Sequence, residues 1–94
     1  MSIERSVEVL QIPGFELMEK IGQGGMAVVW KARQISLDRI VAIKQLLPEF
    51  AREPREVMRL FDEARAAARL KHPGIVQVYD ANEEKGICYF VMEY

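Results

Sequence analysis

The chain has 94 residues, of which 50% are hydrophobic and 29% are charged, and its net charge at pH 7 is −1. This length fits one small domain with a core of its own. The near-neutral charge indicates neither a nucleic-acid partner nor contact with an acidic membrane surface. The apolar runs are far shorter than a membrane span, and the first residues lack the hydrophobic core of a signal peptide. Because Cys88 is the single cysteine, no intrachain disulfide is expected, and we predict a cytoplasmic protein or the cytoplasmic domain of a membrane-anchored parent.

The first half of the chain predicts three strands joined by short turns. Residues 1–14 are expected to form an N-terminal extension, because their apolar residues follow no single period and Pro13-Gly14 is a turn signal. Pro48 ends the last of these strands. The expected strands cover residues 15–21, 27–32 and 39–47, with a glycine cluster at 22–25 and a turn at 34–38 between them.

The second half predicts one helix and two further strands. The helix begins near Pro54, which suits a first-turn position. Its apolar face is expected to carry Val57, Phe61, Ala64 and Ala68, which recur at helical spacing. The predicted features that follow are a stop at His72-Pro73-Gly74, a strand at 75–81, a loop at 82–86 and a strand at 87–92.

The resulting order is βββαββ, which is an α+β pattern. Successive strands with tight links pair antiparallel, so we expect a five-stranded, mostly antiparallel sheet with the helix packed on one face. We also expect Cys88 to be a buried thiol within the last strand, and His72 to serve a turn rather than acid-base chemistry.

The glycine cluster has the spacing Gly22-x-Gly24-x-x-Ala27-x-Val29. Glycines without Cβ atoms allow backbone N–H groups to approach phosphate oxygens closely. An ordinary flexible hairpin would explain the cluster equally well on its own. A dinucleotide-binding fold is disfavoured, because there the glycines lead into a helix, and a P-loop would need a following Gly-Lys-Ser/Thr.

Two further residues suggest a site beside the glycines. Ala42 and Lys44 lie two positions apart on a strand, so they share a face: the small residue leaves room for a flat ring, and the ammonium can reach phosphates. Lys44 could otherwise be an ordinary solvated lysine. Glu63 lies on the shoulder of the helix's apolar stripe, whereas Asp62 lies on the polar side. Glu63 could point toward Lys44 or pair locally with Arg59.

With these motifs in place, the chain resembles the N-terminal lobe of protein kinases, especially the bacterial eukaryotic-like (Hanks-type) serine/threonine kinases. The resemblance rests on "GQGGM", "VAIK", "FDEARAAARL", "HPGIVQVYD" and "YFVMEY", in this order, and covers residues 15–94. It implies that Lys44 binds the α- and β-phosphates of ATP and that Glu63 pairs with it as the second catalytic residue. It also implies that Val29 and Ala42 cover the adenine, that Met92 is the gatekeeper, and that Ala67 and Val78 match the regulatory spine.

By the same resemblance, the ATP-contacting residues are Ile21, Gly22, Gln23, Gly24, Gly25, Met26, Ala27, Val29, Ala42, Lys44, Met92, Glu93 and Tyr94. ATP is expected with Mg²⁺, whose ligands in this family belong to the absent C-terminal lobe, so this chain should provide no metal ligands. The chain stops in the hinge and contains no H-R-D-x-x-x-x-N and no D-F-G segment. We therefore expect the parent to phosphorylate protein Ser/Thr and the chain alone to be inactive.

Two other readings remain open. A kinase-like interaction or regulatory module would use the same lobe without catalysis. A small-molecule phosphotransferase also shares this lobe, although "HPGIVQVYD" and "VMEY" favour protein kinases. An isolated lobe exposes the apolar surface that its partner lobe would cover, so we expect the chain to self-associate as a dimer or larger species.

Overall fold

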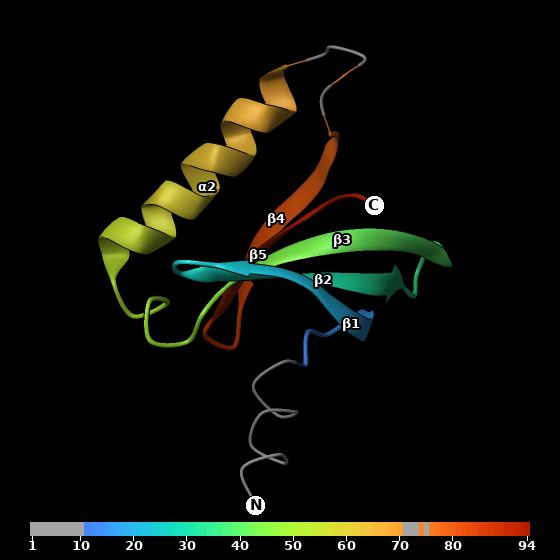
Figure 1. Cartoon of the computed structure of the whole chain (residues 1–94), viewed down its shortest axis with the longest axis horizontal. Coiled ribbons are helices and arrows are strands. Elements are labelled where there is room, and N and C mark those ends of the chain that lie inside the picture. Colours follow the sequence, from blue (N-terminus) through green and yellow to red (C-terminus); the bar gives the residue numbers. More distant parts are fainter. Residues whose placement is uncertain (1–10, 71–73, 75) are drawn as a thin grey trace, which may run out of the picture.

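The computed structural model describes residues 11–70, 74 and 76–94 (Figure 1). The observed order is βββαββ, as the sequence predicts. The elements are β1 (Phe15–Gly24), β2 (Ala27–Gln34), β3 (Arg39–Leu46), α2 (Pro54–Arg69), β4 (Val78–Glu84) and β5 (Ile87–Glu93).

The strands form one five-stranded sheet in the order β1-β2-β3-β5-β4. All four neighbouring pairs are antiparallel, which confirms the expected α+β fold. The connection that contains α2 carries the chain from β3 to the edge strand β4, and β5 then returns to pair with β3. The helix lies on one side of the sheet, where it contacts β4 and β5 (Figure 1).

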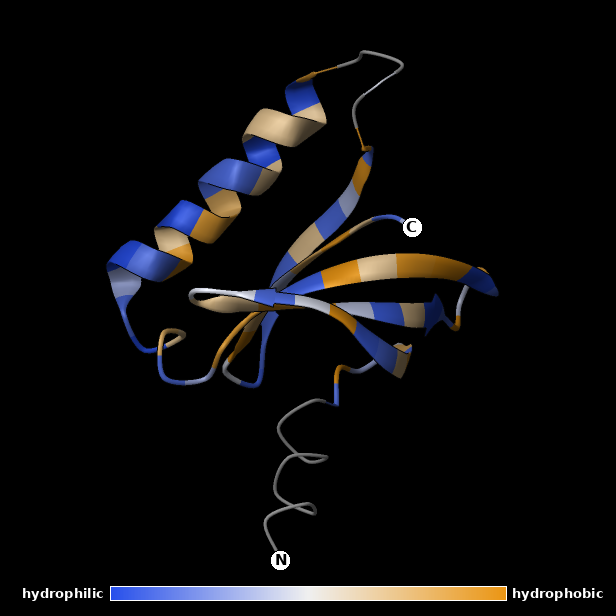
Figure 2. Ribbon diagram, in the orientation of Figure 1, coloured by the Kyte–Doolittle hydropathy of each residue, from blue (hydrophilic) through white to orange (hydrophobic). Residues whose placement is uncertain are grey.

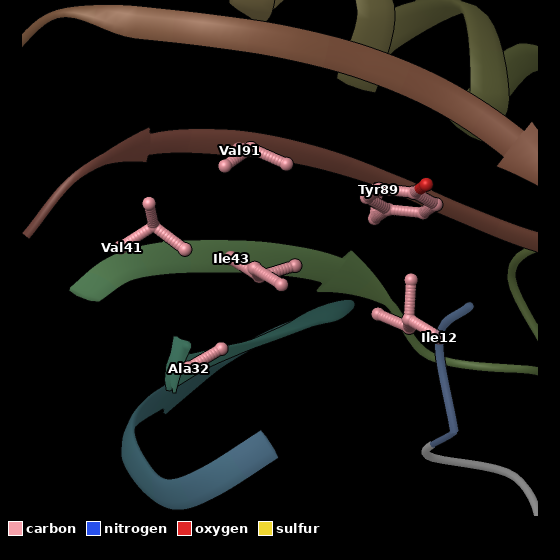
Figure 3. Packing of buried hydrophobic residues seen from close by; sticks show 6 residues of the cluster. All are labelled: Ile12, Ala32, Val41, Ile43, Tyr89 and Val91. Carbon is pink, nitrogen blue, oxygen red and sulfur yellow. The ribbon is translucent and has the colours of Figure 1, made fainter. Parts of the chain in front are cut away.

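The centre of the sheet is buried on both faces, because β3 alternates its side chains between two hydrophobic clusters. Val41 and Ile43 point to the face away from the helix, which we call the outer face, and Leu46 points to the helix-side face. The outer cluster contains six buried residues, which Figure 3 shows side by side: Ile12, Ala32, Val41, Ile43, Tyr89 and Val91. Ile12 precedes the first strand and is only 2% exposed, so the folded unit includes residues before Phe15.

The helix-side cluster holds α2 against the sheet. Its buried members are Leu46, Leu60, Ala64, Cys88 and Phe90. Pro54 occupies the first turn of α2, where its missing N–H costs no hydrogen bond. Burial of Cys88 confirms the expected internal thiol.

The predicted apolar face of α2 is partly wrong. Ala68 is exposed and Phe61 is only half-buried, whereas Leu60 is buried and Ala67 is half-buried. Val57 and Ala64 pack as predicted, but the buried stripe turns toward Leu60 and Ala67, because Leu60 and Ala64 pack in the cluster that joins the helix to the sheet. Figure 2 shows the helix with hydrophobic and hydrophilic residues on different sides.

Four strands end later than predicted, whereas β3 ends one residue early, at Leu46, and β4 begins only at Val78, so the predicted strand start at residues 76–77 is wrong. β1 continues through Gly24, β4 reaches Glu84 and β5 reaches Glu93, so the predicted loop at residues 82–86 shrinks to a turn of Lys85 and Gly86. These two residues have φ values of 54° and 79°, as a type I′ hairpin turn requires. Residues 1–10, 71–73 and 75 lie outside the described residues. They include the His72-Pro73 part of the predicted helix stop at His72-Pro73-Gly74 and the first position of the predicted fourth strand.

The packing of α2 predicts a large difference between two of its residues. Leu60 is 4% exposed and Met58 is 62% exposed. Leu60→Ala should lower the free energy of unfolding by roughly 2–5 kcal/mol, because it leaves a cavity in the helix-side cluster. The control Met58→Ala should change it by less than about 0.5 kcal/mol. Urea denaturation followed by circular dichroism tests this, and equal effects of the two substitutions would contradict the packing.

Candidate functional site

Four of the predicted site residues share the helix-side face of the sheet. Val29 on β2 pairs with Lys44 on β3, and Ala42 on β3 pairs with Met92 on β5. Directly paired residues point to the same face, and Lys44 and Ala42 are two positions apart on one strand. Ala42 is 5% exposed. The strand register therefore places a small residue, a branched residue and a methionine around one ammonium group.

Lys44 and Glu63 form an ion pair in which both carboxylate oxygens accept from the ammonium. Lys44 Nζ donates to Glu63 Oε2 at 2.8 Å and to Oε1 at 3.1 Å. The alternative partner of Glu63 is not used, because Arg59 lies 3.5 Å from Glu56 instead. Asp62 is exposed and pairs with Arg65 at 3.2 Å, as expected for the polar side of the helix. The structure thus brings together the two residues that were predicted to be catalytic.

Packing of α2 determines where Glu63 points. Ala64 and Leu60, which lie one position after it and three positions before it, are buried in the helix-side cluster. They fix the rotation of the helix, so Glu63 emerges at the edge of the contact, facing β3. Phe90 lies beneath the ammonium, with its ring centroid 6.0 Å from Lys44 Nζ. This ring is a neighbour that the sequence reasoning did not single out, although its position two residues before Met92 places it on the same face.

The glycine segment is a continuation of the β1–β2 hairpin. Gly22 pairs with Val29 and Gly24 pairs with Ala27, which leaves Gly25 and Met26 as the turn. Gly25 has a φ of 57° and so needs the freedom of glycine. A Cβ on Gly24 would meet nothing within 4 Å, and Gly24 does not have a positive φ. Neither packing nor backbone strain within the described chain demands glycine there.

The remaining residues of the hairpin differ in exposure. Ile21 is 45% exposed, and Gln23 Oε1 accepts a hydrogen bond from Lys20 Nζ at 2.7 Å. Met26 packs against the helix-side cluster, and its carbonyl accepts from the Leu47 N–H at 2.8 Å, which ties the turn to the end of β3. Ala27 is buried and its backbone is not left-handed, so alanine fits at this position without strain.

Of the last two predicted site residues, Glu93 pairs with Val41, so its side chain lies on the outer face of the sheet, opposite Lys44. Glu93 donates its N–H to the Gln77 carbonyl at 2.8 Å, and its carboxylate accepts from the Gln77 N–H at 3.3 Å. The Glu93 N–H is therefore already used. Tyr94 is 61% exposed, and Lys31 Nζ lies 5.1 Å from the centroid of its ring. Lys31 pairs with Ala42, so a second cation lies on the face that carries Lys44. The sequence analysis did not single out Lys31, although it follows Val29 by two positions on the same strand.

Cys88 is a buried thiol on the helix-side face of the sheet. Burial raises the pKa of the Cys88 thiol, and nearby Glu83 raises it further. A thiol of raised pKa stays protonated, so it is a poor nucleophile.

Among residues 11–70, 74 and 76–94, no three His, Cys, Asp or Glu side chains gather in a way that could hold a metal ion. The described part of the chain also holds no helix with the length and apolarity to cross a membrane.

The site is an open face rather than an enclosed cavity. A hollow of about 850 Å³ lies on the outer side of the sheet, lined by residues such as Phe15, Leu17 and Trp30. None of the predicted site residues lines it. Val29, Ala42, Lys44 and Met92 lie instead on the helix-side face of the sheet.

The exposure of the ion pair predicts that it adds little to stability. The side chains of Lys44 and Glu63 are 28% and 50% exposed. A double-mutant cycle with Lys44→Met and Glu63→Gln should give a coupling of about 0.2–1 kcal/mol, as exposed pairs do, and less at high salt because ions screen it. Urea denaturation measures this, with the Arg65–Asp62 pair as a control on the same helix. A coupling above roughly 2 kcal/mol would contradict a solvent-screened pair.

Comparison with known proteins places this geometry. Residues 15–94 match the protein kinase domain family. The chain is 46% identical over 80 residues to the serine/threonine-protein kinase PrkC of Bacillus subtilis, and the match covers 85% of this chain and 12% of that protein. It is 45% identical over 84 residues to the serine/threonine-protein kinase PknB of Mycobacterium tuberculosis, with coverages of 85% and 13%.

A solved structure, that of PpkA-294 in its apo form, aligns with a TM-score of 0.74 and 29% identity over 92% of this chain and 37% of that one. The chain thus spans a small part of the length of these relatives. The sheet with α2 on one side, the glycine hairpin and the Lys44–Glu63 pair agree with the sequence match. The chain belongs to the protein kinase domain family, and its fold is that family's N-terminal lobe.

Proposed function

We propose that this chain is the ATP-binding lobe of a serine/threonine protein kinase, whose full-length form transfers the γ-phosphate of ATP to Ser or Thr hydroxyls of proteins. The single observation that carries the proposal is the Lys44–Glu63 ion pair on the face below the glycine hairpin. The proposal is also supported by the similarity to PrkC and PknB, both of which are serine/threonine-protein kinases.

In this proposal Lys44 binds phosphate oxygens of ATP, and Glu63 positions it. A free lysine side chain samples many rotamers, and the two hydrogen bonds to Glu63 hold the ammonium near one place. Phosphoryl transfer depends mainly on positioning and on stabilising charge, so a fixed cation is what this half of the site contributes.

The neighbouring residues fit the other parts of ATP. Val29, Ala42 and Met92 offer an apolar surface for one face of the adenine, because Ala42 has no side chain beyond Cβ to obstruct a flat ring. The hairpin from Ile21 to Ala27 would lie over the phosphates, with the open space at Gly24 allowing backbone N–H groups to approach. The Glu93–Tyr94 backbone would lie at the adenine edge, where the Glu93 N–H is already bonded to Gln77 and other groups must serve.

Nucleotide binding tests the proposal directly. Lys44→Met should weaken the binding of ATP by roughly ten- to a hundredfold, because a hydrogen bond to a charged group contributes about 1.5–3 kcal/mol. The matched control is Lys85→Met, which removes an exposed lysine from the hairpin turn between β4 and β5. Titration of ATP followed by NMR chemical shifts detects even weak binding.

The expected shifts cluster at the glycine hairpin, Ala42 and Lys44. If ATP shifts no resonances there, or if both variants bind it alike, the ATP-lobe proposal fails and a kinase-like interaction module becomes the better reading.

We further propose that the chain alone does not transfer phosphate. Mg²⁺ normally neutralises the developing charge in this reaction, and the described residues offer no cluster of metal ligands. The sequence also holds no H-R-D or D-F-G segment. Incubation of highly purified chain with radiolabelled ATP, Mg²⁺ and a protein acceptor should yield no more labelled protein than a control without it; excess label would contradict the proposal.

We propose that the protein works in the cytoplasm, as a free protein or as a domain of a membrane-anchored one.

We also propose that the chain self-associates in solution. Self-association is supported by large apolar side chains at the surface, among them Ile35, Leu37 and Tyr94, which are 51%, 60% and 61% exposed. Light scattering over a range of concentrations should give a mass above the 10.8 kDa of one chain. A monomer mass at every concentration would contradict it.

A further inference from the structure

The outer face of the sheet carries a hollow that the proposed nucleotide site does not use. Its volume is about 850 Å³. Aromatic and aliphatic side chains form much of its wall: Ile12, Phe15, Leu17, Trp30 and Ile87. Gln45 also lines it, is 1% exposed, and accepts a hydrogen bond from Trp30 Nε1 at 3.0 Å. Contact between water and these apolar side chains is unfavourable. A segment that covers the hollow and displaces the water would therefore stabilise the fold.

The chain itself lines the hollow at Gln11 and Ile12. Gln11 is the first described residue and lines the hollow, and Ile12 beside it is buried in the outer cluster near Tyr89 (Figure 3). The residues directly before Gln11 include Val7, Val9 and Leu10. Even fully extended, residue 7 lies within about 14 Å of Gln11. Three apolar side chains are thus tethered to the wall of an apolar hollow.

Charge at the rim fits the same segment. Lys85 lines the hollow, is exposed, and forms no ion pair with any residue in the described part of the chain. Residues 1–10 carry two acidic side chains, Glu4 and Glu8, and one basic one, Arg5. Glu8 lies between the apolar residues, so it would be brought to the rim of the hollow when they enter it.

We propose that residues 7–10 dock in this hollow, with Val7, Val9 and Leu10 against the Trp30 wall. A segment attached directly to the wall has an effective concentration in the millimolar range. It would therefore outcompete a second copy of the chain or a free apolar compound that is present at micromolar concentration. The docked segment supports β3 from the outer face, behind Val41 and Ile43 and opposite Lys44. Residues 7–14 are then part of the folded lobe, and nothing in this proposal depends on nucleotide binding.

The test uses Trp30, the only tryptophan of the chain, as a reporter inside the hollow. The variant combines Val7→Ser, Val9→Ser and Leu10→Ser, and the matched control combines Glu4→Ser and Arg5→Ser in the same segment. The apolar variant should shift Trp30 emission to longer wavelength and increase its quenching by acrylamide. Its unfolding equilibrium constant should rise by roughly tenfold, the effect of returning about one large apolar side chain to water. The control should leave all three readings at their wild-type values.

Three outcomes overturn the proposal, two of them in the variant experiment. One is that Trp30 emission, quenching and the urea midpoint are the same in the apolar variant as in the wild type. The other is that the differences appear only at high protein concentration, which would assign the hollow to a second copy. NMR of the wild-type chain gives a test that needs no variant: nuclear Overhauser contacts between the Trp30 ring and the methyl groups of Val7, Val9 or Leu10 are expected, and their absence would also overturn it.

Discussion

The whole lobe depends on the position of β3, a central strand that must satisfy two buried faces at once. Its alternation sends Val41 and Ile43 into the outer cluster and Leu46 into the helix-side cluster. A shift of register by one residue would exchange these faces and bury the ammonium of Lys44 in the outer cluster, at a large desolvation cost. The hydrophobic pattern of the strand therefore fixes the position of Lys44, the charged residue that β3 contributes to the site.

The helix is placed by different contacts from those that define the site. α2 contacts β4 and β5, and it is held there by Leu60 and Ala64 in the helix-side cluster. Burial of a leucine contributes about 1.5–3 kcal/mol, whereas an exposed ion pair contributes about 0–1 kcal/mol. The Lys44–Glu63 pair is thus a consequence of the helix position, and the packing of Leu60 and Ala64 decides whether Glu63 reaches the lysine.

Much of this architecture is predictable from the sequence, because strands and turns here carry strong local signals. The number of strands, their order along the chain and their antiparallel pairing follow from the alternating apolar residues and from tight links such as the turn at Lys85-Gly86. The strand ends were less predictable, since an edge strand tolerates polar residues on its open face, as β4 does from Asn82 to Glu84. The helix face was predicted only in part, because alanines at 64, 66, 67 and 68 give several equally good stripes, and only the sheet selects one.

The site shows the same division between what local pattern determines and what tertiary packing adds. That Ala42 and Lys44 share a face follows from their spacing on a strand, whereas the choice of Glu63 over a local pair with Arg59 required the docked helix. Lys31 and Phe90 were missed because a residue two positions away on a strand matters only once its neighbours are known to form a site. In the proposed function, a face built this way contributes a positioned cation and a flat apolar surface for ATP.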